Sequence, residues 1–214
     1  MAERKKVGLV LGSGASWGFA HIGVLKVLEE HKIPIDMIAG TSIGAFIGAL
    51  YAAEPNAKKL AQSVLTTKWK KLYDYTLSHT GFIKGIAVET FIKEKLHLTF
   101  DELKIPLYIV AADLENRQEV IFHKGSISKA IHASISIPGI FVPQENNGKI
   151  LVDGGIINPL PVSVLKNLGC DIIIAVNVIP LEKKKSIIEE SFDDKKRTKK
   201  IPHVVQVISK SFEI

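Results

Sequence analysis

The stretch MIAGTSIGAFIGALYAAE, residues 37–54, decides how this sequence is interpreted. It is apolar and rich in glycine, and its one serine, Ser42, lies between two glycines. A membrane span, a buried helix and the mount of a catalytic serine are the three alternatives. Residues 37–53 carry no charged side chain and reach about 17 residues, the lower limit for crossing a bilayer. Because the run begins with a strand-like segment that ends in glycine, we expect a strand followed by a buried helix.

Length and composition fit a single domain with a sizeable core. The chain has 214 residues, of which 46% are hydrophobic and 23% charged, so it can bury a sizeable core. Cys170 is the only cysteine, which excludes an intramolecular disulfide and a cysteine-based zinc site. We therefore expect a cytoplasmic protein. The net charge of +6 favours anionic surfaces, and we expect contact with phospholipid rather than nucleic acid, although ordinary surface charge explains the same excess. The oligomeric state stays open.

Strand and helix signals alternate along the chain. We expect strands at 6–11, 35–40, 106–113, 118–123, 149–153 and 171–178, and helices at 18–31, 43–53, 57–66, 126–135 and 161–169. The run at 171–178 is fully apolar, as in a strand of a buried parallel sheet. This alternation predicts a three-layer α/β fold whose central, mostly parallel sheet is flanked by helices.

The composition changes after the last strand, so we expect a catalytic domain over 1–180. Residues 181–200 read as a charged surface segment or linker, and 183–200 contain eight Lys and Arg residues. Two alternatives stay open for this segment: a solvated loop, and a peripheral contact with anionic membrane. Helical spacing resumes over 201–214, and because no helix stop follows, we expect the native chain to continue beyond Ile214.

Ser42 has the sequence context of a catalytic nucleophile. Gly40-Thr41-Ser42-Ile43-Gly44 fits the G-x-S-x-G pattern where a strand passes into a helix, as a nucleophile elbow requires. Small residues at positions 40 and 44 allow the sharp turn, and the helix N-terminus favours developing negative charge. The plainer alternative is a glycine-rich turn with a serine cap.

Asp153 is the best candidate for the base that such a serine needs. No histidine follows a late strand, where a serine hydrolase with a catalytic triad would place one, and His21 is expected to pack or to make a local hydrogen bond. Asp153 ends a predicted strand and precedes Gly154 and Gly155. Because the ends of parallel strands meet at one crevice, we expect Asp153 to reach Ser42. The alternative is a turn aspartate.

A glycine-rich loop after the first strand, Gly12 to Gly18, completes the candidate site. Its backbone N–H groups at a helix start can bind phosphate or form an oxyanion hole. A dinucleotide site is disfavoured, because the spacing is Gly12-x-Gly14-x-x-x-Gly18 and the expected acid after the second strand is missing.

These motifs together resemble the patatin-like phospholipase family. The resemblance covers roughly residues 5–180 and includes, in order, GFAHIGVLKVLEE after the glycine loop, GTSIGA, AADL (111–114), ASISIPGIFVPQ (133–144) and VDGGIINPLPV (152–162). It implies lipid acyl hydrolysis by a Ser42–Asp153 dyad, an oxyanion hole from the N–H groups of Ser13, Gly14 and Ala15, and no metal or other cofactor. Gly12, Gly18, Gly40, Gly44, Gly154 and Gly155 would support the loop and the elbow.

The glycine loop departs from the family pattern. Ser13 and Ala15 replace loop glycines, and Trp17 stands where the family usually has a basic residue. Backbone donors tolerate such changes if the φ angles allow them, and Trp17 either contacts an acyl chain or packs. Two functions therefore stay open: a lipid ester hydrolase, and a non-catalytic lipid- or partner-binding relative with an impaired oxyanion loop. Asp113 is expected to support the fold.

Overall fold

The structure is a computed structural model that describes residues 4–76, 80–96 and 99–179. Its helices and strands lie in one compact unit, residues 1–178. In chain order they are β1 (Val7–Leu11), η1 (Ala15–Phe19), α1 (Ala20–Glu30), β2 (Met37–Thr41), α2 (Ile43–Ala53), α3 (Ala57–Thr66), η2 (Trp69–Leu72), α4 (Ile86–Leu96), η3 (Phe100–Glu102), β3 (Leu107–Asp113), β4 (Gln118–Phe122), α5 (Ile127–Ser134), β5 (Gln144–Asn146), β6 (Lys149–Asp153), η4 (Gly154–Ile156), α6 (Val162–Asn167) and β7 (Ile172–Val176), where η marks a 3₁₀ helix.

The seven strands form one mixed sheet with the order β5-β6-β3-β2-β1-β7, and β4 also pairs with β3. The pairs β1–β2, β1–β7 and β2–β3 are parallel. The pairs β3–β4, β3–β6 and β5–β6 are antiparallel. The expected α/β sheet is therefore present, and its parallel part is the half that carries the glycine loop and the elbow.

Two strands meet end to end along one edge of β3. On that edge Thr41 of β2 is opposite Val110, and Asp153 of β6 is opposite the next residue, Ala111. The other edge pairs with β4 from Ile109 to Asp113. Because β2 runs parallel to β3 and β6 runs antiparallel, their carboxyl ends face each other. We expected Asp153 on a parallel strand, and this was wrong: the two ends meet because the strands run in opposite directions.

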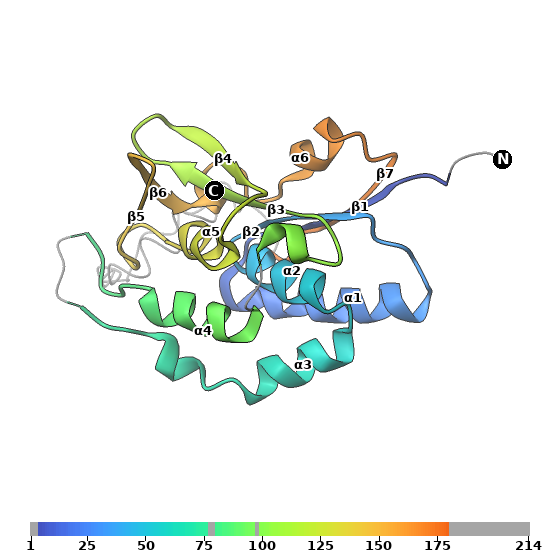
Figure 1. The fold of residues 1–214 in the computed structure, drawn as a ribbon, viewed down its shortest axis with the longest axis horizontal. Helices are drawn as coiled ribbons and strands as arrows, with labels where there is room; N and C mark the ends of the chain where they lie inside the picture. The colour runs from blue at the N-terminus through green and yellow to red at the C-terminus, as the bar shows by residue number, and fades with distance from the viewer. Residues whose placement is uncertain (1–3, 77–79, 97–98, 180–214) are drawn as a thin grey trace, which may run out of the picture. The chain divides into compact units, whose positions relative to one another are not determined.

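Helices cover both faces of the sheet (Figure 1). On one face, α1, α2, α3, α4 and α5 pack with Leu9, Ile38 and Ile109 in the main core. On the other face, Val164 and Leu165 of α6 pack with Val10, Ala39 and Val110. Successive strand residues thus point to opposite faces, as the strand geometry dictates. This arrangement confirms the three-layer fold.

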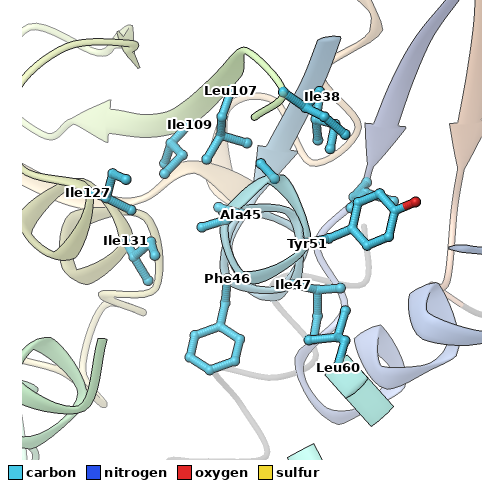
Figure 2. Close-up of a cluster of buried hydrophobic side chains, with 14 of the residues drawn as sticks. Ile38, Ala45, Phe46, Ile47, Tyr51, Leu60, Leu107, Ile109, Ile127 and Ile131 are labelled. Carbon is cyan, nitrogen blue, oxygen red and sulfur yellow. The ribbon is translucent and has the colours of Figure 1, made fainter. Parts of the chain in front are cut away.

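Helix α2 occupies the centre of the main core, which explains its apolar sequence. In Figure 2, side chains from β2, β3, α3 and α5 surround Ala45, Phe46, Ile47 and Tyr51 of this helix. A helix that is apolar all round is buried in protein or in lipid. Residues 37–53 divide into strand β2 and an 11-residue helix, so they are not a continuous span. No helix within the described ranges combines the length and apolar character that crossing a bilayer requires.

Three features differ from expectation. Strand β7 is parallel as expected, but it is an edge strand and Ile172 is 43% exposed. The helix expected at 18–31 is split into η1 and α1, which begins at Ala20. Helix α4 was not predicted, because it buries only Val88 and Ile92 and its pattern is weak. The segments expected at 181–200 and 201–214 lie outside the described residues.

Candidate active site

Ser42 occupies a strained turn between β2 and α2. Its φ of 56° and ψ of −123° lie in a region that residues with a side chain rarely adopt. The turn is tight because the start of α2 packs directly on the first strand. A Cβ atom on residue 44 would lie 2.0 Å from the carbonyl oxygen of Leu11, so Gly44 is sterically required. Gly40 is required in the same way, since its Cβ would lie 2.7 Å from the backbone of Ala45.

Asp153, the last residue of β6, hydrogen-bonds directly to Ser42. The Ser42 hydroxyl donates to Oδ2 of Asp153 over 2.5 Å, and the N–H of Gly155 donates to Oδ1 over 2.7 Å. Gly154 packs against β3, where a Cβ would lie 2.4 Å from the Val110 carbonyl oxygen. Both residues are buried, with 6% of Ser42 and 3% of Asp153 exposed. The structure therefore brings together the two residues that the sequence singled out.

Burial makes Asp153 a much stronger base than an ordinary aspartate. Desolvation raises the pKa of Asp153 to about 6, against the opposing effect of hydrogen bonds from Ser42 and Gly155. At neutral pH the carboxylate is still mostly ionised, and its proton affinity is well above that of an exposed carboxylate. A general base functions best when its pKa is close to the working pH.

The glycine loop lies beside this pair and is held by three hydrogen bonds to other elements. The N–H of Gly12 donates to the Val176 carbonyl over 3.1 Å, and the N–H of Ser13 donates to the Pro159 carbonyl over 2.8 Å. The Ser13 N–H is thus occupied, which differs from the three-donor oxyanion hole that we expected. In the described part of the chain, the N–H groups of Gly14 and Ala15 have no hydrogen-bond partner.

His21 supplies the third bond of the loop. Its ring is fully buried, and Nε2 donates to the Gly12 carbonyl over 2.8 Å, which agrees with the expected packing and local bonding. Burial lowers the pKa of His21, which favours the neutral form of the ring. A Cβ on Gly18 would collide with Ile43 at 2.2 Å, so the loop and the elbow are in close contact. Trp17 is 63% exposed and does not pack in the core.

Among the described residues, no histidine joins Ser42 and Asp153 to form a triad. Within the described residues, no histidine contacts either side chain, and no three His, Cys, Asp or Glu residues gather in a way that could hold a metal ion. Asp113 is buried in the β3–β4 turn, where it accepts hydrogen bonds from Glu115 and Asn116.

Ser134, at the end of α5, lies at the site and was not predicted from the sequence. Its hydroxyl accepts a 2.8 Å hydrogen bond from the backbone N–H of Ser42. The available signal was the pair of serines, Ser134 and Ser136, in the otherwise apolar segment ASISIPG. Polar side chains that close a buried helix need partners, and here one partner is the nucleophile candidate.

A serine on a strand–helix elbow, bonded to a buried aspartate in a mixed sheet, defines a nucleophile-elbow α/β protein. The family model described as "Patatin-like phospholipase" matches residues 9–166. The chain therefore belongs to the patatin-like phospholipase family.

Similar proteins support this assignment. The chain is 39% identical over 184 residues to the lysophospholipase NTE1 of Candida albicans, covering 82% of this chain and 13% of that protein. It is 36% identical over 180 residues to an uncharacterized NTE family protein of Mycobacterium tuberculosis, covering 81% of this chain and 49% of the relative. The chain thus spans half or less of these relatives.

Solved structures share the fold at low sequence identity. VipD from Legionella pneumophila aligns with a TM-score of 0.59 and 16% identity, covering 73% of this chain and 46% of that one. ExoU from Pseudomonas aeruginosa, solved with SpcU, aligns with a TM-score of 0.51 and 16% identity, covering 63% and 39%.

Proposed function

We propose that this protein hydrolyses carboxylic ester bonds of lipids, with Ser42 as nucleophile and Asp153 as general base. The observation that carries the proposal is the 2.5 Å hydrogen bond from the Ser42 hydroxyl to a buried carboxylate whose pKa is raised to about 6. The names of the family and of the NTE1 relatives point to phospholipid or lysophospholipid as the substrate class.

The reaction has two halves. Ser42 Oγ attacks the ester carbonyl carbon while its proton passes to Oδ2 of Asp153. The tetrahedral intermediate collapses, the proton moves to the departing alcohol oxygen, and the acyl group stays on Ser42. Water then attacks the acyl carbonyl, gives its proton to Asp153, and the fatty acid leaves as Ser42 Oγ regains a proton. This scheme needs no metal.

The N–H groups of Gly14 and Ala15 are the proposed donors to the oxyanion. Both are unoccupied in the described structure, and they lie in the loop that packs on the elbow. The loss of one such donor typically raises the barrier by about 2.7–4 kcal/mol. Because the N–H of Ser13 is bonded to Pro159, the stabilisation of the oxyanion depends on fewer donors than the three expected.

Labelling with a fluorophosphonate probe tests this proposal. Wild-type protein is expected to be labelled at Ser42 and to release fatty acid from lysophospholipid or a short-chain ester. Ser42→Ala and Asp153→Asn should lose both activities. Ser128→Ala is the matched control, because Ser128 is also buried but its hydroxyl bonds to Ser126 and, within the described residues, to neither Ser42 nor Asp153. Activity that persists in Asp153→Asn but disappears in a histidine variant would refute the dyad.

The alternative is a lipid-binding relative without catalysis. The bond between the Ser13 N–H and Pro159 favours it, since one expected donor is unavailable. In that case wild-type protein would bind lipid vesicles while Ser42 resisted the probe.

Peripheral membrane contact through the basic segment 183–200 is part of the same proposal. Each cation close to an anionic leaflet contributes on the order of 1 kcal/mol, which salt screens. Deleting 183–200 should weaken co-sedimentation with anionic vesicles at low salt and spare hydrolysis of a soluble ester. Equal binding to neutral and anionic vesicles would count against this role.

A further inference from the structure

The end of α5 and the turn after it, Ser134 to Ser136, bond to the backbones of both dyad residues. The Ser134 hydroxyl accepts the N–H of Ser42 over 2.8 Å. The Ser136 carbonyl accepts the N–H of Asp153 over 2.9 Å. This turn therefore connects the two strand ends that meet along β3.

The Ser134 hydroxyl also donates, so it joins three elements. Its proton goes to the carbonyl oxygen of Val110 over 2.6 Å. Val110 is the last β3 residue that pairs with β2, and the next residue along the same edge pairs with β6. One hydroxyl thus ties the elbow to the central strand and to α5.

The Ser134 hydroxyl is buried and hydrogen-bonded on two sides. Ser134 is 0% exposed, and its hydroxyl both accepts a hydrogen bond from Ser42 and donates one to Val110. Ser42 has a φ of 56° and a ψ of −123°, a conformation that persists only when the surroundings enforce it. The acceptor at Ser134 provides a direct restraint on the backbone of this strained residue.

We propose that Ser134 is a positioning residue that holds the backbone of Ser42 so that Oγ stays directed at Asp153. This inference rests on the proposed hydrolase function. Ser134 does not contact the reacting atoms, so its loss should lower kcat and leave KM nearly unchanged. Misplacement of a reacting group by about 1 Å can cost on the order of 100-fold in rate.

A pair of variants with the same shape isolates the hydroxyl. Ser134→Thr keeps the hydroxyl and adds a methyl group, and Ser134→Val carries the same bulk without a hydroxyl. The kcat of Ser134→Val is expected to fall about 10- to 100-fold below that of Ser134→Thr, with KM equal within about twofold. The rate of fluorophosphonate labelling at Ser42 should fall in parallel.

Smaller variants provide the same test if the added bulk prevents folding. Ser134→Ala is compared with Ser128→Ala, which removes a buried hydroxyl from the start of the same helix. Thermal unfolding of both variants measures the structural cost. Ser134→Ala should lose kcat, and Ser128→Ala should keep it.

Two results would overturn the inference. Equal kcat in Ser134→Thr and Ser134→Val, or in Ser134→Ala and Ser128→Ala, would show that the hydroxyl does not position the nucleophile. A wild-type protein that resists the probe would instead refute the proposed function, and this inference with it, so the two failures are distinguishable.

Discussion

Replacing Asp153 with asparagine should abolish hydrolysis and yet make the folded protein more stable at neutral pH. Asp153 is 3% exposed, and burial raises the pKa of its carboxyl group from 3.8 to about 6. Folding therefore buries an ionised carboxylate, at a cost in desolvation, whenever the pH is above that value. Asparagine has the same shape and no charge. Its Oδ1 can accept from Gly155 and its Nδ2 can donate to Ser42 Oγ, so both contacts of the side chain are kept, and the Ser42 hydroxyl proton is the one group that loses its acceptor among the described contacts of Asp153.

The size of this stability difference, and the pH range over which it develops, follow from the pKa of Asp153 in the unfolded and in the folded protein. A group whose pKa is raised on folding contributes stability below the unfolded pKa, and that contribution is lost as the pH rises through the folded pKa. With about 1.36 kcal/mol for each pH unit, the wild-type protein loses about 3 kcal/mol between pH 3.8 and about 6. The advantage of Asp153→Asn should therefore develop over that range and stay constant above it.

Urea denaturation of the two proteins between about pH 4.5 and pH 8 measures this difference. Asp113→Asn is a control for which we expect the opposite change in stability. Asp113 is equally buried, but hydrogen bonds from Asn116 lower its pKa, so its replacement should destabilise the protein at neutral pH. The reasoning fails if Asp153→Asn is less stable than wild type at about pH 8, or if its advantage is the same at every pH.

Three further perturbations test the site. The labelling rate and kcat/KM should fall tenfold per pH unit below about pH 6 as Asp153 becomes protonated, and a flat profile down to about pH 4.5 would contradict the assigned base. Ser42→Gly should be more stable to heat than Ser42→Ala by about 1–3 kcal/mol, since glycine tolerates the φ and ψ of the elbow; equal stabilities would argue against strain there. Gly44→Ala should cost more than about 4 kcal/mol of unfolding free energy, because its Cβ meets the Leu11 carbonyl, whereas Gly23→Ala has open space and should add about 0.5–1 kcal/mol. Circular dichroism of both glycine variants decides this point, and a stable Gly44→Ala protein would refute it.

Local patterns were enough to predict most elements of this fold. Strands and helices with a strong apolar pattern, such as β2 and α2, begin and end within about two residues of the expected positions. The elbow was predictable because a nucleophile turn needs only a strand, two glycines and a helix in sequence. Asp153 was predictable as the acid at a strand end.

Features that depend on distant residues were not predictable. The direction of β6 is set by pairing with β3 and β5, and nothing within residues 149–153 encodes it. The occupied N–H of Ser13 depends on the carbonyl of Pro159, far along the chain. The contact of Ser134 with Ser42 likewise required the packing of α5. In each case the missing information is a tertiary hydrogen bond.

The opposed ends of β2 and β6 have a consequence for the time at which the protein becomes reactive. Ser42 leaves the ribosome early, on a strand that can pair with β1 at once. Its partner arrives 111 residues later, on a strand that cannot dock until β3 is in place. With the proposed dyad, a nascent chain would carry a chemically ordinary serine until the sheet is nearly complete. Reaction of Ser42 with an active-site probe would then report the end of folding, and a refolding time course could follow it.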